Sequence, residues 1–209
     1  MPRFNGQCSQ DMFVLSALHK KHGGTFLEIG SNDPIDINNT FLLESEFGWK
    51  GVMVEYEEKY LPSYIEKRKN SYYIMKDATK IDYINELEKA NMPTSIDYLQ
   101  IDLEVNNRST LDTLILLDNT VFDTYTFATV TFEHDIYRGN YFNTQQISRD
   151  IFDKRGYVCV FKDVSNDGFP FEDWYVHPSL VDMEHIQTFK SESQRNEFRD
   201  IQAKLLTYF

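Results

Sequence analysis

With 209 residues, the chain is long enough for one well-buried α/β core and short for two, so we expect a single domain. Its formal net charge of −12 argues against sequence-independent binding to DNA or RNA, whose phosphates need clustered Lys and Arg. No apolar run approaches the roughly 20 residues of a membrane span, and the polar N-terminus lacks the features of a secretory signal peptide, so we expect a soluble, cytoplasmic protein.

Short apolar or β-branched runs alternate with segments of helical periodicity along most of the chain. The apolar runs fall at 25–30, 51–55, 72–75, 96–101 and 125–132. The helical segments fall at 11–22, 40–47, 59–69, 83–90, 110–117 and 144–155. Strands that are separated by helices predict a doubly wound α/β fold with a parallel sheet, because each crossover must return over one face of the sheet.

After Gly156 the pattern changes. Segments 157–164 and 171–176 both read as strands, and only a short turn separates them, which predicts an antiparallel hairpin at the sheet edge. Segment 193–206 reads as a terminal helix. The predicted domain therefore has three parts. They are an N-terminal helical region at 1–24, a Rossmann-like core at 25–181 and a C-terminal helical part at 182–209.

The first predicted strand ends in a polar loop. Glu28 and Gly30 are followed by the segment 31–34, Ser-Asn-Asp-Pro, at the carboxyl end of a parallel strand, where open α/β sheets bind ligands. Gly30 allows a tight turn and a close approach of a ligand to the backbone, and a carboxylate such as Glu28 can hold an ammonium or a hydroxyl group. The alternative is a turn that needs Gly only for its conformation. The later glycines of a dinucleotide fingerprint are missing, which disfavours a cofactor bound through its pyrophosphate.

The second and third strand ends carry further candidates for cofactor binding. Glu55 stands about 25 residues beyond Gly30, where Rossmann-type folds place the acidic residue that accepts from ribose hydroxyls, and Tyr56 follows it. Asp77 is suited to accept from an adenine amino group with Ala78 against the ring, and a helix N-cap is an equally good interpretation of Asp77.

A basic cluster, Lys67-Arg68-Lys69, stands at the end of a predicted helix. Positive charge there suits the helix dipole, and we assign the cluster no other role.

Acidic residues and one histidine end the fourth and fifth strands. Asp102 and Glu104 face the same way by two-residue alternation, and Glu133 and His134 follow the fifth strand. If Asp102, Glu133 and His134 converge, they offer oxygen and imidazole ligands for a divalent ion. Alternatively Asp102, Glu104 or His134 takes the proton of a substrate hydroxyl as a general base.

The segment 171–178 is denser in aromatic residues than an edge strand needs. Core packing explains Trp174 as well as a ligand does. The alternative is an aromatic wall for a sugar or another ring, with His177 near its rim.

These motifs, in this order, resemble the FkbM family of S-adenosylmethionine-dependent methyltransferases from about residue 25 to 181. The segments that carry the resemblance are Glu28–Asp33, Asn39-Thr40, Gly48–Gly51, Val54-Glu55, Tyr98–Glu104, Glu133-His134 and Asp173–Pro178. The resemblance implies a seven-stranded, mostly parallel sheet with a reversed last strand, the class I methyltransferase fold. It also implies methyl transfer from S-adenosylmethionine to a hydroxyl oxygen. The sequence departs from the family at Pro34 and Val105, where the family usually has Gly, and Pro34 puts the path of the loop in question.

The resemblance also implies roles for single residues. Glu28, Gly30 and Ser31 would line the methionine part of the cofactor, Glu55 the ribose, and Asp77 with Ala78 the adenine. Asn32, Tyr56 and Asp102 are further candidates for cofactor binding. Asn39, Trp174 and His177 are candidates for binding the acceptor.

More narrowly, the short single-domain form is similar to sugar O-methyltransferases encoded by large algal viruses. That similarity implies a deoxy-sugar acceptor such as rhamnose on a capsid glycan. The acidic charge of the chain argues separately against a nucleic-acid acceptor. Two other readings stay open, an NAD(P)-dependent oxidoreductase and a non-catalytic Rossmann-like subunit.

Overall fold

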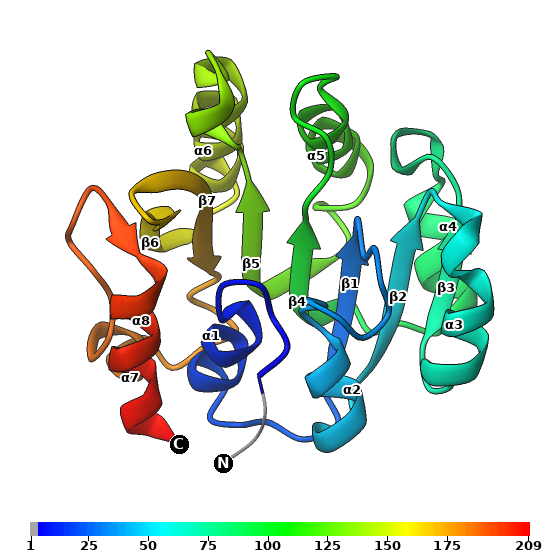
Figure 1. The fold of residues 1–209 in the computed structure, drawn as a ribbon. Helices are drawn as coiled ribbons and strands as arrows, with labels where there is room; N and C mark the ends of the chain where they lie inside the picture. Colours follow the sequence, from blue (N-terminus) through cyan, green and yellow to red (C-terminus); the bar gives the residue numbers. More distant parts are fainter. Residues whose placement is uncertain (1–3) are drawn as a thin grey trace.

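The computed structural model describes residues 4–209 as an eight-stranded sheet with helices on both faces (Figure 1). The strands are β1 (Thr25–Ile29), β2 (Lys50–Glu55), β3 (Tyr72–Met75), β4 (Ser95–Ile101), β5 (Thr126–Glu133), β6 (Val158–Asn166), β7 (Phe169–Val176) and β8 (Asn196–Glu197). Their order across the sheet is β3-β2-β1-β4-β5-β7-β6-β8. The first five strands are parallel, whereas β7 runs antiparallel to β5 and β6. The order reverses between β1 and β4, which is where open α/β sheets bind ligands.

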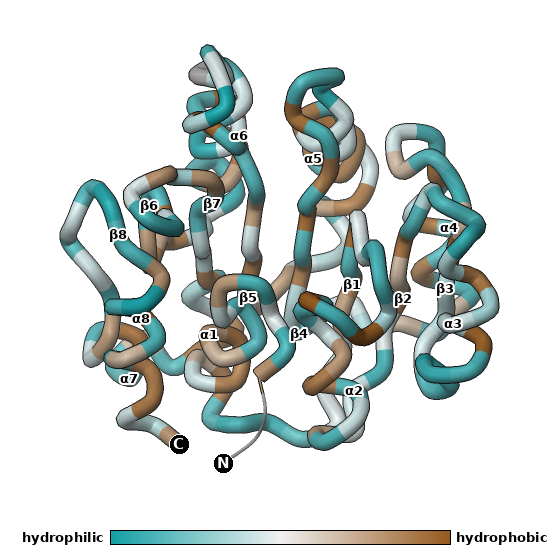
Figure 2. Tube along the Cα trace, viewed as in Figure 1, coloured by the Kyte–Doolittle hydropathy of each residue, from teal (hydrophilic) through white to brown (hydrophobic). Residues whose placement is uncertain are grey.

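Helices cover the two faces of the sheet in separate hydrophobic clusters. The α-helices are α1 (Gln10–Ala17), α2 (Phe41–Phe47), α3 (Leu61–Lys67), α4 (Tyr83–Lys89), α5 (Ser109–Thr120), α6 (Phe142–Lys154), α7 (Met183–Gln187) and α8 (Phe198–Leu205), and the 3₁₀ helices are η1 (Glu58–Tyr60), η2 (Ala78–Lys80), η3 (Ile136–Arg138) and η4 (Leu206–Tyr208). Leu27 and Val130 pack with α4, α5 and α6, whereas Phe26 and Tyr98 pack with α1, α2, α3 and α8. Neighbouring residues serve opposite faces because side chains alternate along a strand. Figure 2 shows hydrophobic stretches in both the strands and the helices, whereas many of the loops beyond the strand ends are hydrophilic.

The predicted α/β sheet and the predicted hairpin are confirmed, and two short elements were not predicted. The hairpin is β6–β7, and the short strand β8 extends the sheet outside it. The terminal helix, predicted at 193–206, begins only at Phe198, because Asn196 and Glu197 are held against β6. The Asn196 side chain donates to the carbonyl of Lys162 at 2.6 Å, and the Glu197 carboxylate accepts from the Ser165 hydroxyl at 3.2 Å. The second element not predicted is α7.

Among residues 4–209, no helix has both the length and the apolar character needed to cross a bilayer.

Candidate active site

A cleft of about 390 Å³ opens at the carboxyl edge of the parallel strands. It lies beside the ends of β1, β2, β4 and β5, within the size range of small-molecule sites. Most of the charged side chains that line it are acidic: Glu28, Glu55, Glu57, Asp102, Glu104, Glu133 and Asp135. Among the described lining residues, Arg138 is the one basic side chain. The cleft therefore favours a cationic ligand over an anionic one.

Glu28 is fully buried at the end of β1 and faces this cleft. One carboxylate oxygen, Oε2, accepts from the Thr40 hydroxyl at 2.8 Å and from the Asn38 amide at 3.2 Å. The other, Oε1, has no hydrogen-bond partner within residues 4–209. Burial raises the pKa of Glu28 to about 7, and the nearby positive charge of Arg68 opposes that rise. A buried carboxylate with one free oxygen is a receptor for an ammonium group.

Gly30 is required by the geometry of the turn that follows β1. Its φ of +84° lies in the left-handed region, and a Cβ added there would come within 1.7 Å of the carbonyl oxygen of Asp102. The amides of Gly30 and Ser31 both donate to the carbonyl of Val54, at 2.9 and 3.1 Å, which ties the turn to β2. Any side chain at this position would push the ends of β1 and β4 apart.

We therefore expect Gly30→Ala to lower the free energy of unfolding by about 2–4 kcal/mol, because the cost of a left-handed Ala and the cost of the clash with Asp102 add together. Gly48→Ala is the matched control. Gly48 has a φ of +68° and no described atom within 4 Å of an added Cβ. Gly48→Ala should therefore lower the free energy of unfolding only by the cost of the left-handed conformation, about 1 kcal/mol. Urea denaturation of both variants measures the difference, and equal losses would contradict the steric argument.

The loop after Gly30 is held in place by Glu55. The Glu55 carboxylate accepts from the backbone amides of Asn32 at 2.7 Å, Tyr56 at 2.7 Å and Glu57 at 2.8 Å. Ser31 lines the cleft, but its hydroxyl bonds to the hydroxyl of Tyr64 in α3 at 2.6 Å. Of the residues predicted to hold a cofactor, Glu28, Gly30, Ser31, Asn32, Glu55, Tyr56 and Asp102 all line this one cleft. The ring of Tyr56 is 73% exposed, so it is free to pack on a ligand.

Asp77 and Ala78 do not belong to the lining of this cleft. The Asp77 carboxylate caps η2, accepting from the Thr79 amide at 3.0 Å, the Thr79 hydroxyl at 2.7 Å and the Lys80 ammonium at 2.7 Å. These bonds, led by the one from Lys80, lower the pKa of Asp77 to about 2. Of the two interpretations of Asp77, the geometry favours the N-cap.

Asp102 and Glu133 bring the ends of β4 and β5 together as an interacting carboxyl pair. Loss of water and the negative charges of Asp102 and Asp135 raise the pKa of Glu133 well above its ordinary value. Loss of water also raises the pKa of Asp102, while a hydrogen bond from Glu133 opposes that rise. The direction of these shifts favours a proton on Glu133, from which a hydrogen bond to the Asp102 carboxylate would form. Glu104 lines the same cleft and is exposed.

No model of a known protein family matches the sequence, and no curated protein matches it. Solved structures share its fold. A TehB-like SAM-dependent methyltransferase from Corynebacterium glutamicum is 10% identical over 80% of this chain and 86% of its own, with a TM-score of 0.51. SMU.1697c from Streptococcus mutans, solved in complex with SAH, is 11% identical over 84% of this chain and 99% of its own, with a TM-score of 0.51. An rRNA methylase from Streptococcus thermophilus is 12% identical over 85% of this chain and 98% of its own, with a TM-score of 0.50.

The chain has the class I methyltransferase fold. This confirms the predicted fold class, with one short strand more than the seven predicted. The inserted antiparallel β7 also separates the sheet from the parallel 3-2-1-4-5-6 order of dinucleotide-binding proteins.

Within this methyltransferase fold, His134 does not join Asp102 and Glu133. Glu133 ends β5 on the α1 side of the sheet, and alternation sends the next residue to the α6 side. There the His134 Nε2 atom lies 3.4 Å from an Asp163 oxygen and 3.6 Å from an Asp173 oxygen, and the imidazole is fully buried. The expected metal site of Asp102, Glu133 and His134 is therefore wrong in its geometry, and so is His134 as a base in the cleft.

Among the described residues, His134, Asp163 and Asp173 form the one group with the spacing of metal ligands. Arg149 already occupies it. Its guanidinium donates to Asp173 at 2.8 and 2.9 Å and to Asp163 at 2.9 Å. A bound Arg neutralises these carboxylates, so the group fits a buried ion-pair network better than a metal site.

Trp174 and His177 also lie away from the cleft. Trp174 is fully buried and stacks on Phe13, with ring centroids 5.0 Å apart, which is the core-packing alternative. His177 follows β7, whose antiparallel direction carries its end to the opposite edge of the sheet, where the His177 amide bonds to Ala128 at the start of β5. The prediction that both line an acceptor site is wrong, because the direction of β7 reverses which of its ends meets the ligand edge.

Asn39 does lie in the cleft, as expected. Its amide donates to Gln100 Oε1 at 2.7 Å, and its own Oδ1 has no partner in the described part of the chain. Gln100 and Asn38 line the cleft too and were not predicted. Two-residue alternation from Asp102 could have indicated Gln100, since both belong to the same face of the β4 segment.

Arg68 stands at the end of α3 as expected, but it is buried beneath the cleft, and the expectation that it has no role beyond the helix dipole is wrong. It is 1% exposed and donates to Glu44 at 2.8 Å, to Asn38 at 2.9 Å and to the Thr40 hydroxyl at 2.7 Å. It also donates to the carbonyl of Pro34 at 3.1 Å, so Pro34 is accommodated in the loop and held there. Nothing in the helical periodicity of 59–69 signals that this one basic residue turns inward.

Proposed function

We propose that this protein is an S-adenosylmethionine-dependent O-methyltransferase that acts on a sugar hydroxyl, with a deoxy-sugar such as rhamnose as the favoured acceptor. The observation that carries the proposal is the free Oε1 of Glu28, which faces an acidic cleft beside the Gly30 turn. S-adenosylmethionine carries an ammonium and a sulfonium, two cations that such a cleft attracts. The fold shared with SMU.1697c, which was solved with SAH, supports the choice of cofactor.

The residues of the cleft fit the parts of this cofactor. Glu28 would hold the ammonium group through its free oxygen, and the Gly30 turn leaves room for the chain that links ammonium and sulfur. A carboxylate has about four lone-pair sites, and three of those on Glu55 are used by backbone amides, so one remains for a ribose hydroxyl. The exposed ring of Tyr56 would pack against the adenine. When bound, the cofactor supplies a methyl group on a positively charged sulfur.

In the proposed reaction Asp102 takes the proton of the acceptor hydroxyl, and Glu133 positions it. The acceptor oxygen attacks the methyl carbon in line while the carbon–sulfur bond breaks and its electron pair stays on sulfur. A carboxylate whose pKa is raised is a stronger base, and the Asp102 pKa is raised by loss of water. This assignment uses residues of the chain alone and needs no metal ion.

The sugar acceptor is supported by the resemblance to the FkbM family and to the sugar O-methyltransferases of large algal viruses. A nucleic acid is disfavoured by the net charge of −12 and by the carboxylates of the cleft, although the structural neighbours include rRNA methylases. An NAD(P)-dependent oxidoreductase is disfavoured for the same reason, because the acidic lining of the cleft would repel a pyrophosphate.

The test is transfer of label from methyl-labelled S-adenosylmethionine to methyl glycosides of rhamnose, fucose and glucose. We expect label on at least one of them, together with a rise in the thermal midpoint with SAH but not with NAD. A midpoint that responds to NAD alone would replace the proposal by the oxidoreductase. SAH binding without transfer to any glycoside or to RNA would favour the non-catalytic subunit.

The affinity for SAH should rise with pH through the pKa of Glu28. Because that pKa is raised to about 7, Glu28 is mostly neutral at pH 6 and mostly ionised at pH 8, and only the ionised form pairs with an ammonium. We expect about a tenfold gain in affinity between these pH values, and Glu28→Gln should abolish the gain.

In the ligand-free protein, ionisation of Glu28 has the opposite effect, because it lowers the stability of the fold as the pH rises. A raised carboxyl pKa stabilises the fold below pH 4.5, and this contribution is lost as the pH rises through 7. Calorimetric titration and denaturation at three pH values test both signs, and a flat SAH affinity in the wild type would remove Glu28 from the ammonium site.

A further inference from the structure

A second cavity of about 220 Å³ adjoins the acidic cleft. The two share the side chains of Gln7, Glu133, Asp135 and Arg138, so the second cavity opens directly beside the carboxyl pair. It lies between the end of β5 with η3 on one side and the β6–β7 hairpin on the other. A molecule in this cavity would face the ligand of the cleft across Glu133.

Aromatic rings form one wall of this second cavity. Tyr137 and Phe169 are 42% and 57% exposed, and their ring centroids lie 5.7 Å apart at an angle of 56°. Phe171 adds a third ring. Exposed aromatic rings that lie together beside a polar cleft indicate a ligand with an apolar face.

Two buried polar atoms without partners also belong to residues that line this cavity. The Oδ1 atom of Asp135 is buried and has no hydrogen-bond partner in the described chain, while its Oδ2 pairs with Arg138 at 3.1 Å. The Oδ1 atom of Asn166 is also without a partner among residues 4–209. Both are acceptors, so they suit a ligand that brings several O–H donors.

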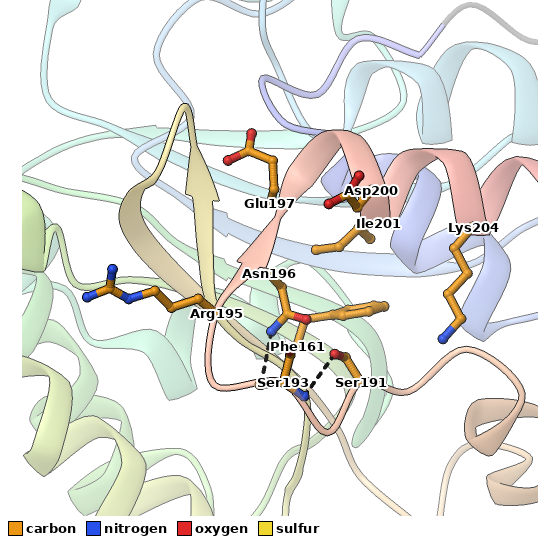
Figure 3. Close-up of a pocket in the computed structure, with 9 residues that line it drawn as sticks. All are labelled: Phe161, Ser191, Ser193, Arg195, Asn196, Glu197, Asp200, Ile201 and Lys204. Atoms are coloured by element: carbon orange, nitrogen blue, oxygen red, sulfur yellow. Dashed lines mark hydrogen bonds between the residues drawn. The ribbon is translucent and has the colours of Figure 1, made fainter.

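A cavity of similar volume near the C-terminus differs from the second cavity in the pairing of its buried polar atoms (Figure 3). It is formed by residues of β6, β8 and α8 and shares no lining residue with the cleft. The Asn196 amide at its centre already donates to Lys162 and Ser193. None of the buried polar atoms without partners in the described chain lies on a residue of this wall.

We infer that the second cavity is the acceptor subsite and that it takes a neutral, polyhydroxylated ring with one apolar face, such as a hexose or deoxyhexose, and excludes anionic sugars. This rests on the proposed methyl transfer. The ring packs on Tyr137 and Phe169, and its hydroxyls donate to Asp135 and Asn166. The reacting hydroxyl projects past Glu133 into the cleft, gives its proton to Asp102 and gains the methyl group as the carbon–sulfur bond breaks. A uronate or a phosphosugar would place its charge against the carboxylate of Asp135.

The test compares the double variant Tyr137→Ala/Phe169→Ala with the wild type. We expect KM for methyl α-L-rhamnopyranoside to rise about fivefold to tenfold, with SAH affinity and thermal midpoint unchanged. Tyr72→Ala is the matched control, because Tyr72 is 43% exposed on β3, at the far edge of the sheet, and should leave KM unchanged. The wild type should also prefer methyl galactopyranoside over methyl galacturonide by at least about tenfold in kcat/KM. An unchanged KM in the double variant, or equal use of the galacturonide, overturns the inference.

Ligand-observed NMR separates this inference from the proposed function. With SAH present, saturation should pass from the wild-type protein to the ring protons of a neutral glycoside and be lost in the double variant. If saturation is transferred in the wild type and lost in the double variant, but no methyl transfer is detected, the proposed function fails and the binding site stands. If methyl transfer occurs and the double variant keeps full saturation, the subsite is wrong and the function stands.

Discussion

Replacing Asp102 by Asn is expected to lower kcat for methyl transfer by about a hundred- to ten-thousandfold, the range found when a general base is removed. Asn has nearly the same shape and cannot accept the hydroxyl proton. The backbone amide of Asp102 still donates to the carbonyl of Ile29 at 3.0 Å, so the end of β4 should keep its place. SAH affinity, measured by calorimetry, reports on the cofactor part of the cleft and should change by less than about threefold.

Two further variants make this prediction specific. Glu133→Gln should cost much less than Asp102→Asn, because Gln still donates a hydrogen bond to the Asp102 carboxylate as protonated Glu133 does. Glu104→Gln removes an exposed carboxylate from the same cleft and should leave kcat within about twofold. If Glu104→Gln costs as much as Asp102→Asn, the effect comes from the charge of the cleft and not from proton transfer.

The pH dependence of kcat should agree with the same assignment. Loss of water raises the pKa of Asp102 above its ordinary value, so activity should fall on the acidic side as this carboxylate becomes protonated. The fall in kcat at acidic pH should be absent in Asp102→Asn.

The main fold was readable from the sequence because its signals are local. Apolar runs such as 96–101 are too short for helices and are separated by helical segments, and together these features predict a parallel doubly wound sheet. Even the reversed strand β7 was predictable, since 157–164 and 171–176 leave no room for a crossover. The two residues of β8 have no local signal, because they pair with β6 through contacts made by Asn196 and Glu197 across about 30 positions in sequence.

The cofactor side of the candidate site was largely predictable for a related reason. The carboxyl ends of parallel strands meet at one edge, so Glu28, Glu55 and Asp102 had to come together once the sheet was assigned. His134 and His177 were misplaced by the details of that geometry. One residue of alternation sends His134 to the other face, and the reversal of β7 carries His177 to the other edge.

The support beneath the site was not predictable, because it depends on one long side chain turning inward from the end of a helix. Arg68 gave no sign in the sequence of differing from Lys67 and Lys69, yet it joins α3, the loop at Pro34 and the segment that carries Asn38 and Thr40. Those last two residues hold Glu28. Arg68 therefore supports the proposed ammonium site without contacting it.

Arg68→Met should lower the free energy of unfolding by about 3–5 kcal/mol, because it leaves the buried Glu44 carboxylate without its partner. Met keeps much of the length and apolar volume of the Arg stem, so the loss reports on charge and hydrogen bonds more than on a cavity. Lys67→Met is the matched control. Lys67 is exposed, its one ion pair among the described residues is with the exposed Glu66, and its replacement should cost less than about 0.5 kcal/mol.

A second consequence ties Arg68 to function. Its positive charge opposes the rise in the pKa of Glu28, so Arg68→Met should move the pH at which SAH affinity increases to above about 7. Adding Glu44→Gln to Arg68→Met removes the unpaired charge and should recover part of the stability, while the pH shift in SAH affinity persists, since the charge that faced Glu28 is still absent. Stability and SAH affinity that recover together would mean that Arg68 acts on Glu28 only by keeping the loop folded.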